Sequence, residues 1–327
     1  MLELPYSTQA WSSVADELLA RLGPTQEMPG NFEHDYRRQQ IADYAIIALD
    51  NAEREDEIIP LCEREVSSTG SYKRLVDQLL VAGRTAEAEQ WARTGIAATA
   101  CQYPGISSSL REVICNLRGQ AGDWMMVAAM HAETFFYAPS LAALQTLMAS
   151  AAHAQVAQAV RAAALAFLET GQLPQPREQH VGAATIPRWP LPDTGIPAVE
   201  QRYPLRFPQL AILIGLAISE NDPDEVLRWY DKRTTPVDGQ LNDDMVADAI
   251  VKRYPEQAAA IWQQLAAAQV ALTNTGAYEE AARFLRKLRR TYKTPEQIAL
   301  WEQSVSYTHL RAHETDSYLV CRLLLEK

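Results

Sequence analysis

The chain of 327 residues lacks the residue patterns on which many enzyme and metal sites depend. It has no Gly-rich phosphate loop, no HExxH motif and no GxSxG motif. None of its four cysteines stands in a CxC or CxxC spacing, which argues against a zinc site or a redox pair. The sequence therefore predicts a non-enzymatic protein with no catalytic residues, no metal and no cofactor. We interpret the cysteines as small apolar packing groups. They are Cys62, Cys101, Cys115 and Cys321.

An excess of positive charge and long apolar runs are also missing. Lys and Arg number 30 against 41 Asp and Glu, which gives a formal net charge of -11 and argues against nucleic-acid binding over the whole surface. Binding of nucleic acid through a local basic patch remains an alternative. No apolar run approaches the roughly 20 residues that cross a bilayer, and the first residues lack the basic-then-apolar order of a signal peptide. We therefore expect a soluble cytoplasmic protein without membrane contact.

A weakly repeated pair of helical segments is the most informative pattern that is present. It is clearest at 72–96, and its register returns at 110–135 and 271–288. In each pair an apolar first helix is expected to end at a glycine, and a second helix then buries an aromatic side chain or a leucine. The three glycines are Gly83, Gly122 and Gly276. Such pairs bury their apolar faces by stacking, so the sequence predicts an all-α, TPR-like helical-hairpin α-solenoid.

Helical spacing of apolar residues predicts helices through most of the chain. In a region of 1–170 they are expected at 11–22, 36–48, 56–66, 72–82, 85–99, 109–120, 124–137, 141–148 and 156–167. In a region of 209–303 they are expected at 209–219, 222–232, 243–254, 255–273 and 278–292. Between these regions, 171–208 holds eight prolines and is predicted to be a linker or an ordered crossover. Trp189 either pins that segment to a surface or belongs to a peptide that other proteins read, and we favour the first interpretation.

Residues that could carry chemistry each have a structural explanation. Three acidic pairs stand where helices are expected to begin, and helix dipoles favour acids there. The pairs are Asp243 with Asp244, Glu279 with Glu280, and Asp222 with Asp224. His131 and His153 lie among apolar residues and are interpreted as core or boundary histidines rather than metal ligands. Four tryptophans at comparable helix positions favour packing between helices over base stacking. They are Trp91, Trp124, Trp229 and Trp262.

The last predicted helix has a basic face, and this face is the candidate interaction surface. Its residues are Arg283, Arg286, Lys287, Arg289, Arg290 and Lys293. An anionic partner is one interpretation of this face. A solvated helix face near the end of an array is the other.

Two segments carry a resemblance to a known family. The first resembles the helical region downstream of the zinc finger in bacterial SWIM-domain proteins, and it reads YKRLVDQLLVAGR at 72–84 with AEAEQWARTGI at 86–96. The second resembles the end of that region and reads AYEEAARFLRKL at 277–288. The likeness covers about 11–304. The finger's CxC and CxH are absent, so no zinc ligand is carried over, and the chain is either a fragment without its finger or a split protein.

The resemblance implies DNA binding or protein association by the whole protein, with the helical part as an adaptor. Similar bacterial proteins are thought to work beside MoxR-type ATPases and von Willebrand A-type proteins. Those two classes are therefore the expected partners.

The segment 304–327 is predicted to be a translated sequencing adapter. VSYTHLRAHET from Val305 and LVCRLLLEK from Leu319 can be back-translated into the two parts of such an adapter, with Asp316 to Tyr318 as its index. His309, His313 and Cys321 would then carry no function. The alternative is an amphipathic C-terminal helix that places Leu319, Leu323 and Leu324 on one face.

Three hypotheses of function follow. The first is a non-catalytic helical-repeat scaffold that binds another protein. The second is a nucleic-acid accessory module that uses the basic face of 283–293. The third is an all-helical enzyme with a pocket at the Pro-rich crossover.

Overall fold

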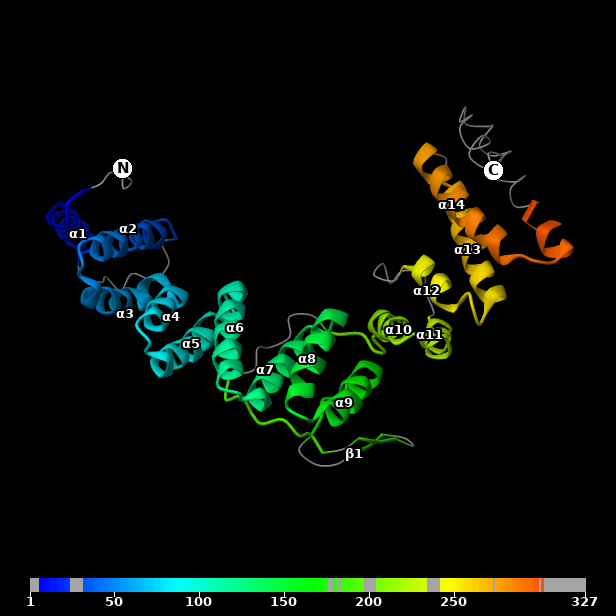
Figure 1. The fold of residues 1–327 in the computed structure, drawn as a ribbon, viewed down its shortest axis with the longest axis horizontal. Coiled ribbons are helices and arrows are strands. Elements are labelled where there is room, and N and C mark those ends of the chain that lie inside the picture. The colour runs from blue at the N-terminus through cyan, green and yellow to red at the C-terminus, as the bar shows by residue number, and fades with distance from the viewer. Residues whose placement is uncertain are drawn as a thin grey trace. The chain divides into compact units, whose positions relative to one another are not determined.

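The protein is all-α, as predicted (Figure 1). Its structure, a computed structural model, describes residues 6–23, 32–175, 179–181, 184–186, 188–196, 204–233, 242–272, 274–299 and 301–302. These residues include fourteen α-helices, one 3₁₀ helix and one pair of three-residue strands. The predicted adapter segment, 304–327, lies outside the described residues.

The helices before the Pro-rich segment are α1 (Thr8–Leu22), α2 (Phe32–Asn51), η1 (Glu55–Glu57), α3 (Ile58–Thr69), α4 (Tyr72–Val81), α5 (Thr85–Thr99), α6 (Pro104–Gln120), α7 (Trp124–Tyr137), α8 (Leu141–His153) and α9 (Ala157–Thr170). Strands β1 (Gln179–Val181) and β2 (Ala184–Ile186) pair antiparallel, with Gln179 opposite Ile186. The remaining helices are α10 (Leu210–Ser219), α11 (Pro223–Tyr230), α12 (Asp243–Ile250), α13 (Pro255–Val270) and α14 (Thr275–Thr291). Most predicted helices are confirmed with shifted ends.

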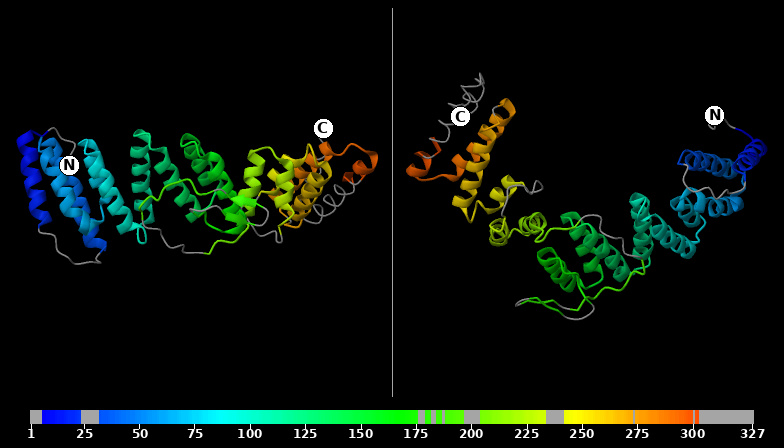
Figure 2. Two further views of the ribbon diagram at one scale, coloured as in Figure 1. Left: turned by 90° about the horizontal axis from the view of Figure 1, so that it is seen from below. Right: turned by 180° about the vertical axis from the view of Figure 1, so that it is seen from behind.

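The chain forms two compact units. The first comprises Met1–Ala138, Ala143–Arg161 and Gln175–Pro204, and the second comprises Pro139–Ala142, Ala162–Pro174 and Leu205–Lys327. Within the first unit each helix from α1 to α7 packs against its successor, and Figure 2 shows these helices side by side. Within the second unit α10 to α14 pack in the same sequential way. The division predicted from the sequence, at 170 and 208, stays a prediction.

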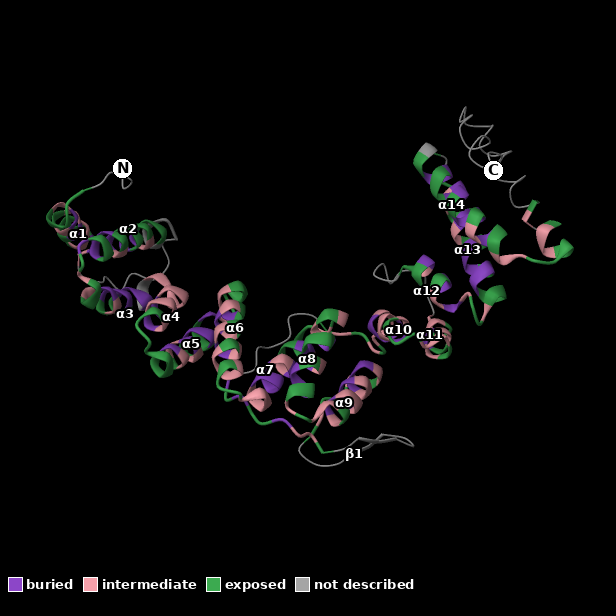
Figure 3. Ribbon diagram, in the orientation of Figure 1, coloured by how far each residue is buried: buried purple, intermediate pink, exposed green. Residues whose placement is uncertain are grey.

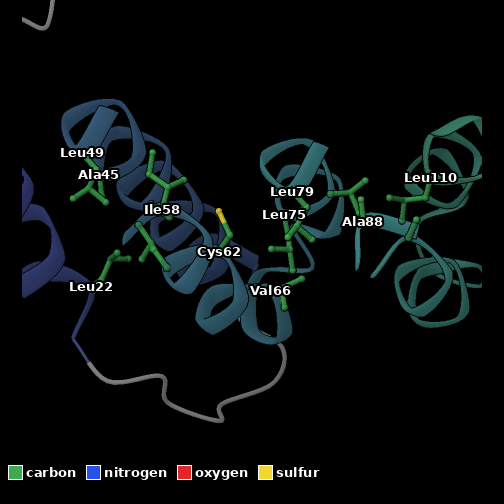
Figure 4. Packing of buried hydrophobic residues seen from close by; sticks show 14 of the residues in the cluster. Leu22, Ala45, Leu49, Ile58, Cys62, Val66, Leu75, Leu79, Ala88 and Leu110 are labelled. Carbon is green, nitrogen blue, oxygen red and sulfur yellow. The ribbon is translucent and has the colours of Figure 1, made fainter. Parts of the chain in front are cut away.

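The core of the first unit is continuous from α1 to α6. Leucine, isoleucine and valine side chains from successive helices meet there with Cys62, and alanines fill the narrower gaps (Figures 3 and 4). Gly95 of α5 lies where three helices come closest. A Cβ at Gly95 would stand 2.7 Å from the Cβ of Tyr72 in α4 and 2.6 Å from Leu110 in α6, so no larger residue fits. Gly95 therefore permits a close approach of α5 to α4 and α6.

One turn recurs between helices. At five places a residue with a left-handed backbone (φ between 56° and 75°) follows the helix, and the next residue donates its backbone N–H to the carbonyl five positions earlier at 2.8 to 3.0 Å. This is the hydrogen bond of a Schellman motif, which satisfies a carbonyl that the helix end leaves open. The left-handed residues are Glu53, Gly83, Gly122, Gln155 and Asn221.

These five turns close every hairpin from α2 to α11. They link α2 to η1 and α3, α4 to α5, α6 to α7, α8 to α9, and α10 to α11. The intervals between the left-handed residues are 30, 39, 33 and 66 residues, so the last is twice the one before it. A period close to 33 residues is typical of helical-hairpin repeats.

The prediction for the third glycine was wrong. Gly276 does not end a helix, because α13 ends at Val270 and Gly276 lies in the first turn of α14. Asn274 caps that helix instead, accepting the backbone N–H of Ala277 at 2.9 Å. The start predicted for α6 at 109 was also wrong. The helix begins at Pro104, whose missing N–H is tolerated in a first turn.

The recurrent turn generates a pair of substitutions with opposite expected signs. Gly122→Ala should lower the free energy of unfolding by about 1 kcal/mol, because an L-residue resists the left-handed backbone. Added atoms at Gly122 meet nothing within 4 Å, so packing does not contribute. Gln155→Gly should raise the same free energy by up to about 1 kcal/mol. Urea unfolding followed by far-UV circular dichroism measures both.

Gly105→Ala is the matched control. Gly105 also has open space around its Cβ position, but it lies within α6 and lacks a positive φ. This substitution should leave stability unchanged or raise it by about 0.5 kcal/mol. Equal losses in Gly122→Ala and Gly105→Ala would show that the turn backbone is not the cause.

Candidate interaction site on helix α14

Helix α14 carries the predicted basic residues up to Arg290, and its buried side holds it against the second unit. Its apolar stripe is buried, with Tyr278 and Ala281 fully buried and Leu285 and Leu288 each 1% exposed. This stripe packs α14 against α13 within the second unit. The basic residues therefore project from a helix whose rotation about its own axis is fixed by burial.

Two of the six predicted cations are neutralised by α12. Lys287 donates to Asp244 and to Asp248, each at 2.7 Å. Arg283 donates to Asp244 at 2.9 Å and also pairs with Glu280 of its own helix. These two residues therefore join α14 to α12, and their charge is used within the second unit.

Asp244 is the centre of this cluster and is almost entirely buried. Its Oδ1 accepts the indole N–H of Trp262 at 2.8 Å in addition to the Lys287 ammonium. Burial by itself raises the pKa of the Asp244 carboxyl. The hydrogen bonds from Lys287 and Trp262 outweigh burial and hold that pKa below its usual value. Lys287 also lies over the Trp262 ring, 5.6 Å from its centroid.

The other four cations are exposed. They are Arg286, Arg289, Arg290 and Lys293. Arg289 lies over the ring of Trp301 at 5.7 Å from its centroid, and Trp301 is held by a hydrogen bond from its indole N–H to the Leu285 carbonyl at 2.8 Å. Arg289 and Arg290 stand in the last turn, where the helix dipole favours positive charge. The candidate surface is therefore smaller than the sequence predicted, with four charges rather than six.

The acidic pairs divide between capping and ion pairing. Asp222 caps α11, accepting from the N–H groups of Asp224 and Glu225 at 3.2 Å, as predicted. At α12 the cap is Asn242, which accepts from the Asp244 N–H at 3.1 Å. The interpretation of Asp244 as a helix-start acid was incomplete, because its carboxylate binds residues of α13 and α14. Nothing local in the sequence marks that role.

Two histidines and two cysteines of the first unit are packed among its helices. The Nδ1 atom of His131 lies 3.1 Å from the Ser150 hydroxyl, and burial lowers the His131 pKa. The His153 ring stacks on Trp124 with centroids 4.3 Å apart. Burial raises the pKa of the Cys62 and Cys115 thiols to about 11, so both are protonated at neutral pH.

The predicted packing role of the tryptophans fits their surroundings. Trp229 and Trp262 are 4% and 3% exposed in the second unit, so neither offers a free face for base stacking. Arg228 and Lys232 lie over the Trp229 ring at 4.7 Å and 4.2 Å. Trp91 packs against the core of the first unit.

Part of the Pro-rich segment is built into the first unit as an extended strap at 188–196. The Trp189 ring contacts Phe136 of α7, with centroids 5.7 Å apart. Arg93 of α5 donates to the Thr194 carbonyl at 2.7 Å, and the Thr194 hydroxyl donates to Glu133 of α7. Ile196 joins the core of the first unit at 7% exposure. This geometry supports the packed interpretation of Trp189.

A groove of about 680 Å³ lies between α6 and α7 in the first unit. Its walls include Glu112, Asn116 and Trp124, together with His131 and Cys115. Its titratable side chains are Arg111 and Glu112 together with the protonated thiol and the hydrogen-bonded imidazole described above. The groove belongs to one unit, so it differs from the crossover pocket that the enzyme hypothesis requires.

The Asp244 cluster predicts a pH-dependent loss of stability. Asp244→Asn should lower the free energy of unfolding by about 2 kcal/mol at pH 7, because it leaves Arg283 and Lys287 without their shared counter-charge. Because the folded-state pKa of Asp244 is depressed, its contribution is present above the unfolded pKa of about 3.9 and is lost as the pH falls below it. Urea unfolding at pH 7 and at pH 3 measures the effect.

Asp248→Asn is the control for this cluster. Asp248 is 54% exposed and pairs with Lys287 alone, so its removal should cost less than about 0.5 kcal/mol. A difference between wild type and Asp244→Asn that stays constant from pH 7 to pH 3 would contradict the assignment.

Across the described residues, no group of three or more His, Cys, Asp or Glu side chains could hold a metal ion. None of the described helices is long and apolar enough to cross a membrane. No protein-family model, no characterised protein and no solved structure matches this chain.

Proposed function

We propose that this chain is a non-catalytic helical-repeat scaffold, a TPR-like α-solenoid that binds another protein. The observation that carries the proposal is the single turn geometry that closes all five hairpins from α2 to α11. A chain that repeats one hairpin and one turn builds its core between neighbouring hairpins. Each hairpin then leaves part of its helices exposed, and such surfaces serve recognition.

The chemistry of the described residues supports a binding role over a catalytic one. The His131 imidazole is held by Ser150, and the thiols of Cys62 and Cys115 have raised pKa values. An activated nucleophile needs the opposite, a lowered pKa or an adjacent base. A scaffold needs none of these groups, since its affinity comes from apolar anchors and complementary charge.

The partner class rests on the family resemblance. If the chain is the helical part of a SWIM-type bacterial protein, a MoxR-type ATPase or a von Willebrand A-type protein is its partner, and the cytoplasm is its location. The helical region would then act as an adaptor in a larger assembly. Binding to purified members of these two classes is the direct way to examine this part of the proposal.

The scaffold proposal is tested by affinity capture with the folded full chain. The immobilised chain should retain one or a few proteins in near-stoichiometric amount from an extract of the cells that make it. The control is an unrelated all-α protein of similar net charge, which removes proteins that bind any acidic helical surface. Capture no greater than on the control would overturn the proposal. Purified candidates should then bind with a dissociation constant in the micromolar range or tighter.

The second candidate is a nucleic-acid accessory module, and the four exposed cations on α14 and just after its end favour it. Fluorescence anisotropy with a DNA duplex should show binding whose logarithm falls with the logarithm of salt, with a slope of about -2 to -4 for two to four phosphate contacts. Arg286→Glu with Arg290→Glu should abolish it. Arg21→Glu is the control, because Arg21 is 65% exposed on α1 in the other unit. Absence of a salt-dependent signal would remove this candidate.

A further inference from the structure

Helix α2 exposes three large apolar side chains. Its buried side carries Leu49 at 0% exposure, with Ala42, Ala45 and Ala48 at 1% or less. On another side of the helix, Tyr36 is 54% exposed, Tyr44 is 48% exposed and Ile47 is 43% exposed. Burial of apolar surface is favourable, so these three side chains offer area for a contact.

The three residues form one stripe. Positions 36, 44 and 47 fall within an arc of about 80° at 100° per residue, and they span about 16 Å along the helix axis. Gln40 lies between them and donates to the Tyr36 hydroxyl at 3.2 Å. Together the three expose about 300 Å² of side chain, if an aromatic side chain contributes about 200 Å² in full. A patch of that size is where exposed apolar surface begins to mark a binding site.

The surroundings of this stripe are acidic. Residues 1–70 contain fourteen acidic and five basic residues, so this stretch supplies most of the formal charge of -11. Asp50 and Glu53 are exposed beside the stripe. Arg37 of α2 is exposed as well. Other nearby cations are engaged, since Arg38 is buried with Glu65, Arg54 pairs with Asp16 and Glu57, and Arg74 of α4 pairs with Asp43. Asp50 and Glu53 outnumber Arg37 beside the stripe, so the net exposed charge there is negative.

We propose that this surface, the α2 face of Tyr36, Tyr44 and Ile47, docks a helical segment of a partner protein that carries an apolar stripe flanked by Lys and Arg. The inference rests on the proposed scaffold function and names its docking surface and the chemistry of its partner. The partner's apolar stripe covers Tyr44 and Ile47. Its basic flanks meet Asp50 and Glu53, and its arginines can stack on the tyrosine rings.

A second copy of this chain fits the α2 face less well. The basic helix α14 offers cations, but its large apolar residues are buried against its own unit. It would supply charge without the apolar stripe that Tyr44 and Ile47 need. Charge complementarity together with exposed apolar area therefore favours a different chain.

The test uses the full chain and two synthetic peptides. Each peptide is an amphipathic helix of about 18 residues with the same leucine stripe, flanked by Lys and Arg in one and by Glu in the other. Fluorescence anisotropy should show micromolar binding of the basic peptide, weakened at high salt, and at least tenfold weaker binding of the acidic peptide. Tyr44→Ser with Ile47→Ser should weaken binding of the basic peptide at least tenfold.

Met245→Ser is the matched control. Met245 is 54% exposed on α12 of the second unit, so its loss removes a similar apolar surface elsewhere. Peptide affinity should stay unchanged in this variant. Unfolding midpoints should be the same in all variants, since none of the three residues is buried.

Each other outcome overturns the inference. Equal binding of both peptides, or wild-type affinity in the α2 variant, shows that the α2 face is not the docking surface. Salt-dependent self-association that the α2 variant abolishes identifies a second copy as the occupant instead. Capture experiments separate this inference from the scaffold proposal. If the α2 variant still retains the partner, only the inference about the α2 face is wrong. If the wild-type chain retains no partner, the scaffold proposal is wrong.

Discussion

A single left-handed residue at each hairpin turn from α2 to α11 is the constraint on which this part of the fold depends. That residue reverses the chain after the first helix, and the hydrogen bond that follows it closes the open helix end. Gly83 and Gly122 adopt this backbone without cost, and Asn221 tolerates it better than most residues, whereas Glu53 and Gln155 adopt it against their preference. The hydrogen bond and the packing of the following helix together outweigh about 1 kcal/mol of strain at each such residue. Because the same turn recurs, successive hairpins can pack with similar geometry, and alanines such as Ala88 and Ala92 suffice where helices lie close.

Charge is distributed unevenly along this chain, and much of it is used internally. Asp244 holds Arg283 and Lys287, and Glu65 holds Arg38, which also donates to the Leu22 carbonyl at 2.7 Å. The Asp244 carboxylate joins α12 to α14, and the Glu65 carboxylate joins α3 to α2. Buried ionic groups of this kind are costly to desolvate, so their benefit lies in fixing which helices meet. The charges left at the surface are then acidic around α2 and basic on the outer side of α14.

Local signals were enough to predict most of the helices, and tertiary contacts explain what they missed. Apolar spacing and the caps placed α5 and α7 to the residue, and the glycines at 83 and 122 marked two turns. The turns at Glu53 and Gln155 carry no such mark, because their backbone is set by hydrogen bonds rather than by residue type, whereas Asn221 is a weaker mark than glycine. Gly276 misled for the opposite reason: glycine in a first helical turn looks like glycine at a helix end. The candidate site was predicted in part, since the partners of Arg283 and Lys287 lie 39 and 43 residues away.

The α2 face shows why sequence motifs alone do not reveal the function of this all-α chain. Packed helices need small or apolar residues on the sides that face their neighbours, so outward residues are open to another role. Where such residues are charged or polar, solvation accounts for them. Where they are large and apolar, as at Tyr36, Tyr44 and Ile47, exposure to water has a cost that folding does not recover. Selection removes one exposed apolar residue only weakly, but it acts more strongly against three that share one stripe. A contact outside the unit is then the simplest physical account of their presence.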